Sequence, residues 1–169
     1  MEITIKTQYD QKAMTALARG LRKTVRKKHS RRSHIFGWIV VVMAAILVLS
    51  ATEINGKVIF TGLAGLMIVL ALLFEDALNG MIAMKRGIPG LHSAVTTFRE
   101  DGYHSKTEVG ESDFPYAPIV AMAESKDYFL LLIGPSHGQV DDKRGFLSGT
   151  AEDFRRLLEE KTGKTFQKV

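Results

Sequence analysis

Two stretches without a single charged residue, 35–52 and 58–74, set the strongest limit on how this chain can fold. As helices rising about 1.5 Å per residue, each spans ~26 Å, close to the ~30 Å apolar thickness of a bilayer. The alternative is a pair of buried helices in a soluble protein. A chain of 169 residues has little other material to cover helices that are apolar on every face. The sequence therefore predicts transmembrane helices at 35–52 and 58–74.

The link between these stretches is short, 53–57, and contains the turn-forming pair Asn55-Gly56. A link of this length makes the two helices antiparallel neighbours, so both termini of the chain lie on the same side of the membrane. Small residues, which let helices approach closely, gather at the start of the second stretch: Thr61, Gly62, Ala64 and Gly65. We therefore expect a transmembrane hairpin.

Positive charge is concentrated before the first stretch. Residues 1–57 contain 11 basic and 3 acidic side chains, whereas 58–169 contain 12 basic and 15 acidic ones. The basic side chains that determine topology are Arg19, Arg22, Lys23, Arg26, Lys27, Lys28, Arg31 and Arg32. The positive-inside rule places them, and both termini, in the cytoplasm. We expect a multi-pass membrane protein, with Trp38 as an interfacial anchor.

Other roles can be considered for the basic run. Nucleic-acid binding fits poorly, because the only nearby aromatic residues, Phe36 and Trp38, lie inside the apolar stretch. A cleaved signal peptide also fits poorly, because a long charged region precedes the apolar stretch and no A-x-A site follows it. Binding to anionic lipid headgroups and a purely topological role stay as two alternatives.

The N-terminal segment, 1–34, has the pattern of a strand followed by an amphipathic helix. Apolar and polar residues alternate in 2–6, which is typical of a strand, and Asp10 can cap a following helix. Apolar residues then recur three or four positions apart on one helical face: Met14, Leu17, Leu21 and Val25. The basic residues occupy the other faces, so this helix is expected to lead to the membrane.

Beyond residue 74 the sequence predicts a connector, 75–92, and a small β-module, 93–166. Helix 75–86 is expected to continue the second span until 86–90 break it. Strands are expected at 94–99, 103–109, 118–124 and 127–133, with one or two more in 139–147, and a turn at 110–112. A closing helix begins after Thr150 and ends before Gly163. Strand 2–6 has no other partner, so we expect it to pair with this sheet.

The residues that could carry chemistry do not form a recognisable site. The chain has no cysteine, and His92, His104 and His137 lack metal-ligand spacing. The acids Glu75 and Asp76 are expected to mark the end of the second span. Asp141-Asp142 beside Lys143-Arg144 is expected to be a solvated charged turn. We therefore expect no catalytic residue, no cofactor and no metal.

The layout resembles the YcxB-like family of bacterial membrane proteins. Three segments carry the resemblance: TTFREDGY at 96–103, APIVAMAESKDYFLLLI at 117–133 and DDKRGFLSGTAEDFRRLLEEK at 141–161. Family members usually have Pro-Lys-x-x-Phe before the closing helix. Here Lys143 and Phe146 match, and Asp142 stands where Pro is common. The resemblance implies two transmembrane helices and a C-terminal module like a small pleckstrin-homology (PH) domain, without any catalytic residue to carry over.

The fold expected is therefore an α+β membrane protein, in which a transmembrane hairpin precedes a small antiparallel PH-like β-module closed by a C-terminal helix. The expected function is non-enzymatic, with the module binding a protein or a lipid headgroup. Its partners are the bilayer, anionic headgroups, and another membrane protein or further copies of the chain, but not nucleic acid. A small oligomeric transporter or channel accessory subunit is the alternative. A hydrolase or transferase would need a pocket that holds His104 or His137 beside an acid.

Overall fold

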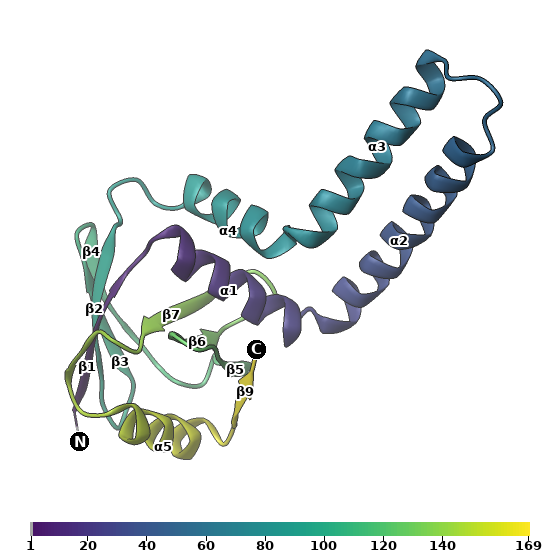
Figure 1. The fold of residues 1–169 in the computed structure, drawn as a ribbon. Helices are drawn as coiled ribbons and strands as arrows, with labels where there is room; N and C mark the ends of the chain where they lie inside the picture. Colours follow the sequence, from purple (N-terminus) through teal and green to yellow (C-terminus); the bar gives the residue numbers. More distant parts are fainter. Residues whose placement is uncertain (1) are drawn as a thin grey trace.

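The computed structural model describes residues 2–169, and within them five helices and nine strands form an α+β fold. Two sheets and three of the helices make a module, from which a pair of long helices projects (Figure 1). Both termini lie on the module (Figure 1).

The first sheet has five strands in the order β4-β3-β2-β1-β8, all antiparallel to their neighbours. Their bounds are β1 (Ile3–Gln8), β2 (Ser93–Phe98), β3 (Tyr103–Thr107), β4 (Gly110–Phe114) and β8 (Phe146–Ser148). The N-terminal strand thus pairs with β2 on one side and β8 on the other, as the sequence predicts. A turn was expected at 110–112, but the chain there returns as β4.

The second sheet has the order β7-β6-β5-β9. Its strands are β5 (Ala121–Glu124), β6 (Tyr128–Leu132), β7 (Gly138–Asp142) and β9 (Phe166–Lys168). β9, which the sequence did not predict, pairs in parallel with β5, and the other pairs are antiparallel. Every residue of β6 is buried, because both faces of this sheet are covered. β6 therefore lies inside its sheet, between β7 and β5.

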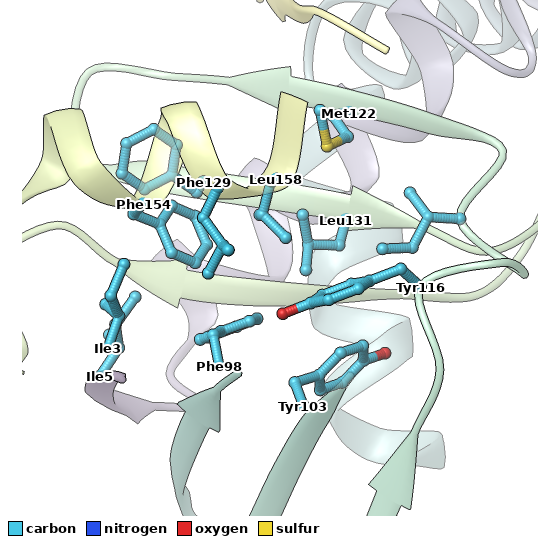
Figure 2. Packing of buried hydrophobic residues seen from close by; sticks show 12 residues of the cluster. Ile3, Ile5, Phe98, Tyr103, Tyr116, Met122, Phe129, Leu131, Phe154 and Leu158 are labelled. Carbon is cyan, nitrogen blue, oxygen red and sulfur yellow. The ribbon is translucent and has the colours of Figure 1, made fainter. Parts of the chain in front are cut away.

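The larger core lies between the two sheets and is closed by α5 (Ala151–Thr162) (Figure 2). The ring of Phe154 packs edge-on against Phe98, with centroids 4.8 Å apart, and lies equally close to Phe129. The Thr150 hydroxyl accepts a hydrogen bond from the Asp153 backbone amide at the start of α5. Gly163 ends the helix at φ +66°, a left-handed conformation that favours glycine.

The second core lies on the other face of the β7-β6-β5-β9 sheet, under α1 (Gln11–Lys23). Gly20 is needed here, because a Cβ atom at this position would lie 2.5 Å from the Leu130 Cδ1 atom. The apolar stripe of the N-terminal helix therefore packs into the module. The helix is also shorter than the sequence suggests, since it ends at Lys23 and leaves Val25 exposed in a turn.

The two long helices are α2 (Lys27–Leu49) and α3 (Gly56–Leu73), and both are long and apolar enough to cross a membrane. They run side by side away from the module (Figure 1). Small residues lie where they meet: a Cβ atom on Gly65 would be 3.3 Å from the Ala44 Cβ, and one on Gly62 would be 3.7 Å from Val48. The small residues at the start of the second apolar stretch thus include two that face α2.

The next helix is α4 (Glu75–Arg86). The sequence predicted that it continues α3, but it does not. The chain changes direction at Phe74, and α4 then lies alongside α1 (Figure 1). Gly80 allows this close approach, because a Cβ atom there would lie 2.7 Å from the Thr15 backbone nitrogen. The segment expected to be a connector is therefore a packed layer of the module.

Candidate functional site

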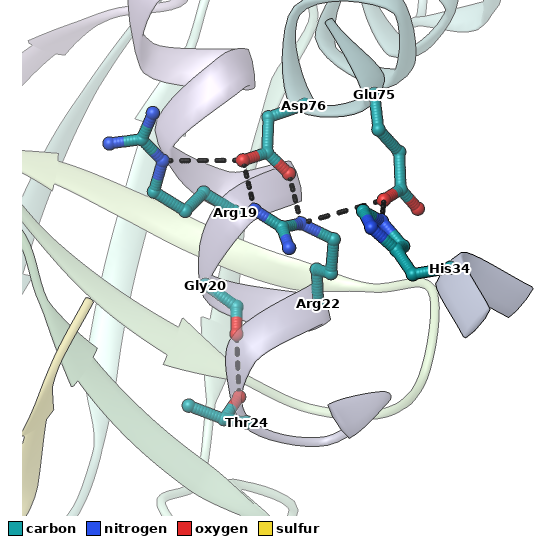
Figure 3. Close-up of polar contacts among 7 residues, drawn as sticks. All are labelled: Arg19, Gly20, Arg22, Thr24, His34, Glu75 and Asp76. Atoms are coloured by element: carbon teal, nitrogen blue, oxygen red, sulfur yellow. Dashed lines mark hydrogen bonds and ion pairs between the residues drawn. The ribbon is translucent and has the colours of Figure 1, made fainter. Parts of the chain in front are cut away.

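The most highly charged contact in the structure joins the C-terminal half of α1 to the first turn of α4 (Figure 3). The Arg22 guanidinium donates from Nε to Asp76 Oδ1 at 2.6 Å and from Nη2 to Asp76 Oδ2 at 2.7 Å. This is the bidentate geometry that makes arginine–carboxylate pairs strong. Arg19, one turn earlier on α1, donates from Nε to Asp76 Oδ2 at 3.3 Å.

A third helix joins the same contact through Glu75. The His34 Nε2 of α2 is hydrogen-bonded to Glu75 Oε2, and the Arg22 Nε lies 3.7 Å from that same oxygen. We call these five residues the junction cluster: Arg19, Arg22, His34, Glu75 and Asp76. The cluster fixes where α2 leaves the module and where α4 begins after α3.

The cluster keeps its buried carboxylate charged. Burial alone would raise the pKa of Asp76, but the hydrogen bonds and positive charge of Arg22, helped by Arg19, lower this pKa below its usual value. The same contacts raise the pKa of Arg22. Asp76 is 9% exposed, so the arginines replace the water that would otherwise stabilise its charge.

The structure divides the basic residues predicted to determine topology into two groups. Arg19 and Arg22 belong to the junction cluster and so have partners within the protein. The other six are exposed, and within residues 2–169 no ion pair involves them: Lys23, Arg26, Lys27, Lys28, Arg31 and Arg32. They lie at the end of α1, in the turn after it and on the first turns of α2. Trp38 lies on α2 and is 45% exposed.

The sequence did not reveal the partners of Glu75 and Asp76, which were expected only to mark the end of an apolar stretch. A signal was present, since two acids directly after a charge-free run match two arginines one turn apart on the N-terminal helix. The pairing could not be predicted because it depends on the change of direction at Phe74.

A second ionic cluster lies at the edge of the larger core. The Lys143 ammonium donates to Glu124 Oε1 at 2.6 Å and to the Ser125 carbonyl at 2.7 Å, and it lies 4.8 Å from the centre of the Phe129 ring. Arg155 donates to the same Glu124 carboxylate at 3.0 Å. This cluster gives Lys143 a structural role: it holds the β7–β8 turn against β5, beside α5.

The third polar feature lies inside the module, on β7. Asp141 is fully buried; its Oδ1 accepts a hydrogen bond from the Gln139 side chain at 2.9 Å. Asp141 Oδ2 is the one buried side-chain oxygen or nitrogen in residues 2–169 without a hydrogen-bond partner. Burial raises the pKa of Asp141 to about 7, and the Gln139 bond opposes this only in part. The solvated turn expected at 141–142 is thus wrong for Asp141, although Asp142 pairs with Arg144 as a turn residue would.

Hydroxyl groups of the first sheet surround this carboxyl group. Gln139 also donates to the Thr96 hydroxyl at 3.3 Å, and Thr96 lies 3.4 Å from the hydroxyl of Ser105. A cavity of about 500 Å³, lined in part by Ser105, Gln139 and Tyr103, opens beside these groups. A neighbouring cavity of about 540 Å³ is mostly apolar and lies between α1, the end of α4 and β7. Both hollows could hold a small ligand.

The histidines do not come together. His104 bonds Asp113 on the exposed face of the β3–β4 pair, at 2.9 Å, while His92 and His137 lie on separate loops. Among the described residues no group of three or more histidine, aspartate or glutamate side chains is arranged to hold a metal ion.

Comparison with known proteins identifies the module. Residues 98–159 match the family described as YcxB-like protein. The match runs from the last residue of β2 into α5; it contains the segment 117–133 and overlaps most of 96–103 and 141–161, so the YcxB-like resemblance is confirmed. No curated protein and no solved structure matches the chain.

The matched residues of the YcxB-like segment have roles in packing. Lys143 holds Glu124, and Phe146 packs beside Phe154 in the larger core, with ring centroids 6.0 Å apart. The matched segment does not include β1, although β1 pairs with its strand β8 and with β2, whose last residue begins the segment. The YcxB-like domain therefore folds with a strand that comes from before the two long helices.

Proposed function

We propose that this protein is a non-enzymatic integral protein of the bacterial inner membrane, which presents its YcxB-like module at the cytoplasmic surface. The observation that carries the proposal is the exposure of α2 and α3. Large apolar side chains on them, such as Ile46 at 59%, Leu47 at 61% and Phe60 at 74% exposed, contact no core of the protein. Such a surface is unfavourable in water and is matched by the apolar interior of a bilayer.

The orientation rests on charge. The six exposed basic residues lie where α2 leaves the module, at the inner end of the proposed hairpin, while the loop at its far end has only Glu53 and Lys57. The positive-inside rule favours the module in the cytoplasm with both termini. Trp38 is then within the first turns of the apolar part of α2, where an interfacial aromatic residue is expected.

The proposed task of the module is binding rather than catalysis. Two sheets around one core, closed by the C-terminal helix α5, support the view that the module is PH-like, a fold type that serves as a platform for ligands. Its proposed ligand is a protein or a lipid headgroup. The junction cluster supports this task, since it holds the module in one position relative to α2 and α3.

The proposal can be tested by expressing the full chain in bacteria and extracting the membranes with alkaline carbonate. We expect the protein to stay in the pellet and to float with lipid on a density gradient. Release into the supernatant would contradict integral insertion. Purified protein in liposomes then separates the two functional classes: robust ion or solute flux would favour the transporter alternative, and an absence of flux would favour the binding module.

A further inference from the structure

The outward face of α4 is apolar although the helix lies on the surface of the module. The opposite face is buried against α1, where Asp76 and Gly80 make close contacts. On the outward side four large apolar residues are 41–55% exposed: Phe74, Leu78, Met81 and Ile82. They are spaced three or four residues apart and so form one stripe along the helix. The stripe contacts nothing in the structure that would remove it from water.

The position of α4 relative to the long helices determines which way this stripe faces. α4 follows α3 after the single residue Phe74 and turns sharply from its axis, so it runs sideways from the base of α3 over the module, on the side away from α2 (Figure 1). It lies over α1 on the side of the module from which α2 and α3 project (Figure 1). A surface in this position faces the bilayer if α2 and α3 cross it.

The apolar surface continues past the end of α4. Ile88, in the following loop, is 62% exposed. Val109 in the β3–β4 turn is 49% exposed and adjoins this loop, because a Cβ atom on Gly90 would be 3.6 Å from its Cγ1. These residues extend the stripe beyond the helix, at the level of the module surface.

The charges around the stripe suit an anionic surface. Lys85 and Arg86 are exposed in the last turn of α4, and the exposed basic residues of α2 lie near its other end. The two acids of α4 have partners within the junction cluster: Glu75 contacts His34 and Arg22, and Asp76 pairs with Arg19 and Arg22. An apolar face with basic residues at its edges is typical of a helix that lies in the plane of a membrane interface.

We infer that the outward face of α4, with the loop that follows it, lies in the headgroup region of the same bilayer that α2 and α3 cross, and that it binds anionic lipid there. This inference rests on the proposed function. It gives the module a second contact with the membrane besides the hairpin. This contact holds α4, and α1 beneath it, along the lipid surface. The occupant is the bilayer itself, because the stripe is continuous with the lipid-facing helices through Phe74.

Fluorescence quenching by brominated lipids can test the inference, because Trp38 is the chain's one tryptophan. In the parent protein, quenching of Trp38 measures insertion of the hairpin. In the variant Trp38→Phe/Ile82→Trp, quenching measures contact between the outward face of α4 and lipid. The variant Trp38→Phe/Leu147→Trp is the matched control. Ile82 and Leu147 are both exposed, at 46% and 64%, so neither substitution disturbs a core. Leu147 lies on β8, which pairs with the N-terminal strand and leads into α5, and α5 lies on the opposite side of the module from α4 (Figure 1).

Each full-length protein is reconstituted in vesicles of phosphatidylglycerol and phosphatidylcholine, the latter brominated high on its acyl chain. We expect loss of emission and a blue shift for the tryptophan at position 82 and neither for that at position 147. We also expect the loss at position 82, but not that at Trp38, to shrink when phosphatidylglycerol is omitted. Shallow quenching that does not depend on anionic lipid would contradict the claim of anionic-lipid binding.

Two outcomes separate failure of the inference from failure of the proposed function. If Trp38 is quenched and the tryptophan at position 82 is not, the hairpin is inserted but α4 does not touch the bilayer. A blue shift at position 82 without quenching would mean that a second copy or a protein covers the stripe, which also overturns the inference. If Trp38 itself is not quenched, the hairpin does not enter the membrane and both proposals fail.

Discussion

Arg22 and Asp76 are 54 residues apart in the sequence, yet two hydrogen bonds of 2.6 and 2.7 Å join their side chains. Between them in the chain lie both long helices. The contact therefore closes a loop formed by the whole hairpin, and it fixes the start of α4 against the end of α1. A module on a simple flexible connector would not need this contact.

The first prediction concerns this pair. Asp76→Asn leaves Arg19 without a counter-charge and Arg22 with only the more distant Glu75, so we expect the free energy of unfolding of the module to fall by about 2 kcal/mol. Urea unfolding of the detergent-solubilised protein, followed by the near-ultraviolet circular dichroism of the buried tyrosines, measures the change. The double variant Arg22→Asp/Asp76→Arg reverses the pair and should recover part of the loss. If Asp76→Asn has full stability, the pair does not hold the two helices together.

The raised pKa of the buried Asp141 carboxyl group predicts an unusual dependence of stability on pH. Its pKa is about 7 in the folded protein and about 4 in the unfolded chain. Between these values the folded state binds more protons, so this group makes the free energy of unfolding fall as pH rises from about 4 to about 7. Asp141→Asn removes the effect and should be more stable than the parent protein at pH 8, by up to about 4 kcal/mol.

The matched control for this experiment is Asp142→Asn. Asp142 is the next residue, but its carboxylate bonds Arg144; burial alone would raise its pKa, and the Arg144 contacts lower it below the usual value. Stability from Asp142 is therefore present above pH 4 and is lost as pH falls through the lowered pKa. Thermal unfolding from pH 4 to pH 8 compares the three proteins. Equal slopes for Asp141→Asn and the parent would show that Asp141 is not protonated in the fold.

The next prediction concerns the contact between Lys143 and Glu124 in the YcxB-like segment. Lys143→Met keeps most of the side-chain volume but removes both hydrogen bonds of the ammonium group, leaving Glu124 with Arg155 alone. We expect a loss of about 1–2 kcal/mol in the same unfolding measurement. Lys126→Met, at an exposed turn position, should change stability by less than about 0.5 kcal/mol. Equal effects of the two substitutions would contradict the structural role of Lys143.

A further prediction tests whether the first strand belongs to the C-terminal module. Ile5 is fully buried between the sheets, so Ile5→Ala should cost about 3 kcal/mol. Lys6 points outward from the same strand, and Lys6→Ala should be nearly neutral. Deleting 2–8 should leave the module unable to unfold cooperatively. A module that remains equally stable without these residues would show that β1 is dispensable.

Much of the secondary structure could be predicted because it is encoded locally. The charge-free runs predicted α2 and α3, the strands expected at 94–99 and 103–109 correspond to β2 and β3, and Thr150 with Gly163 marked both ends of α5. The pairing of β1 followed from a different argument, since a lone strand needs a partner. These features depend on nearby residues or on simple hydropathy.

Features that depend on the tertiary fold were missed. β4 has no buried residue and β9 has three residues, so neither carries a hydrophobic pattern. The stripe on α1 matches both a membrane surface and a protein core, and only the second sheet decides between them. Asp141 lies in a run of charged residues that suggests a turn, and only the alternation along β7 puts it inside.

The central claim is that α2 and α3 cross the membrane with the module in the cytoplasm, and labelling of single cysteines tests it most directly. The chain has no cysteine, so Glu53→Cys in the α2–α3 loop and Lys126→Cys in the β5–β6 turn, both at exposed positions, each add one target. We predict that a membrane-impermeant maleimide labels Glu53→Cys in intact bacteria and labels Lys126→Cys only after the inner membrane is permeabilised. Labelling of Lys126→Cys in intact cells, or recovery of both variants in the soluble fraction, would contradict the account.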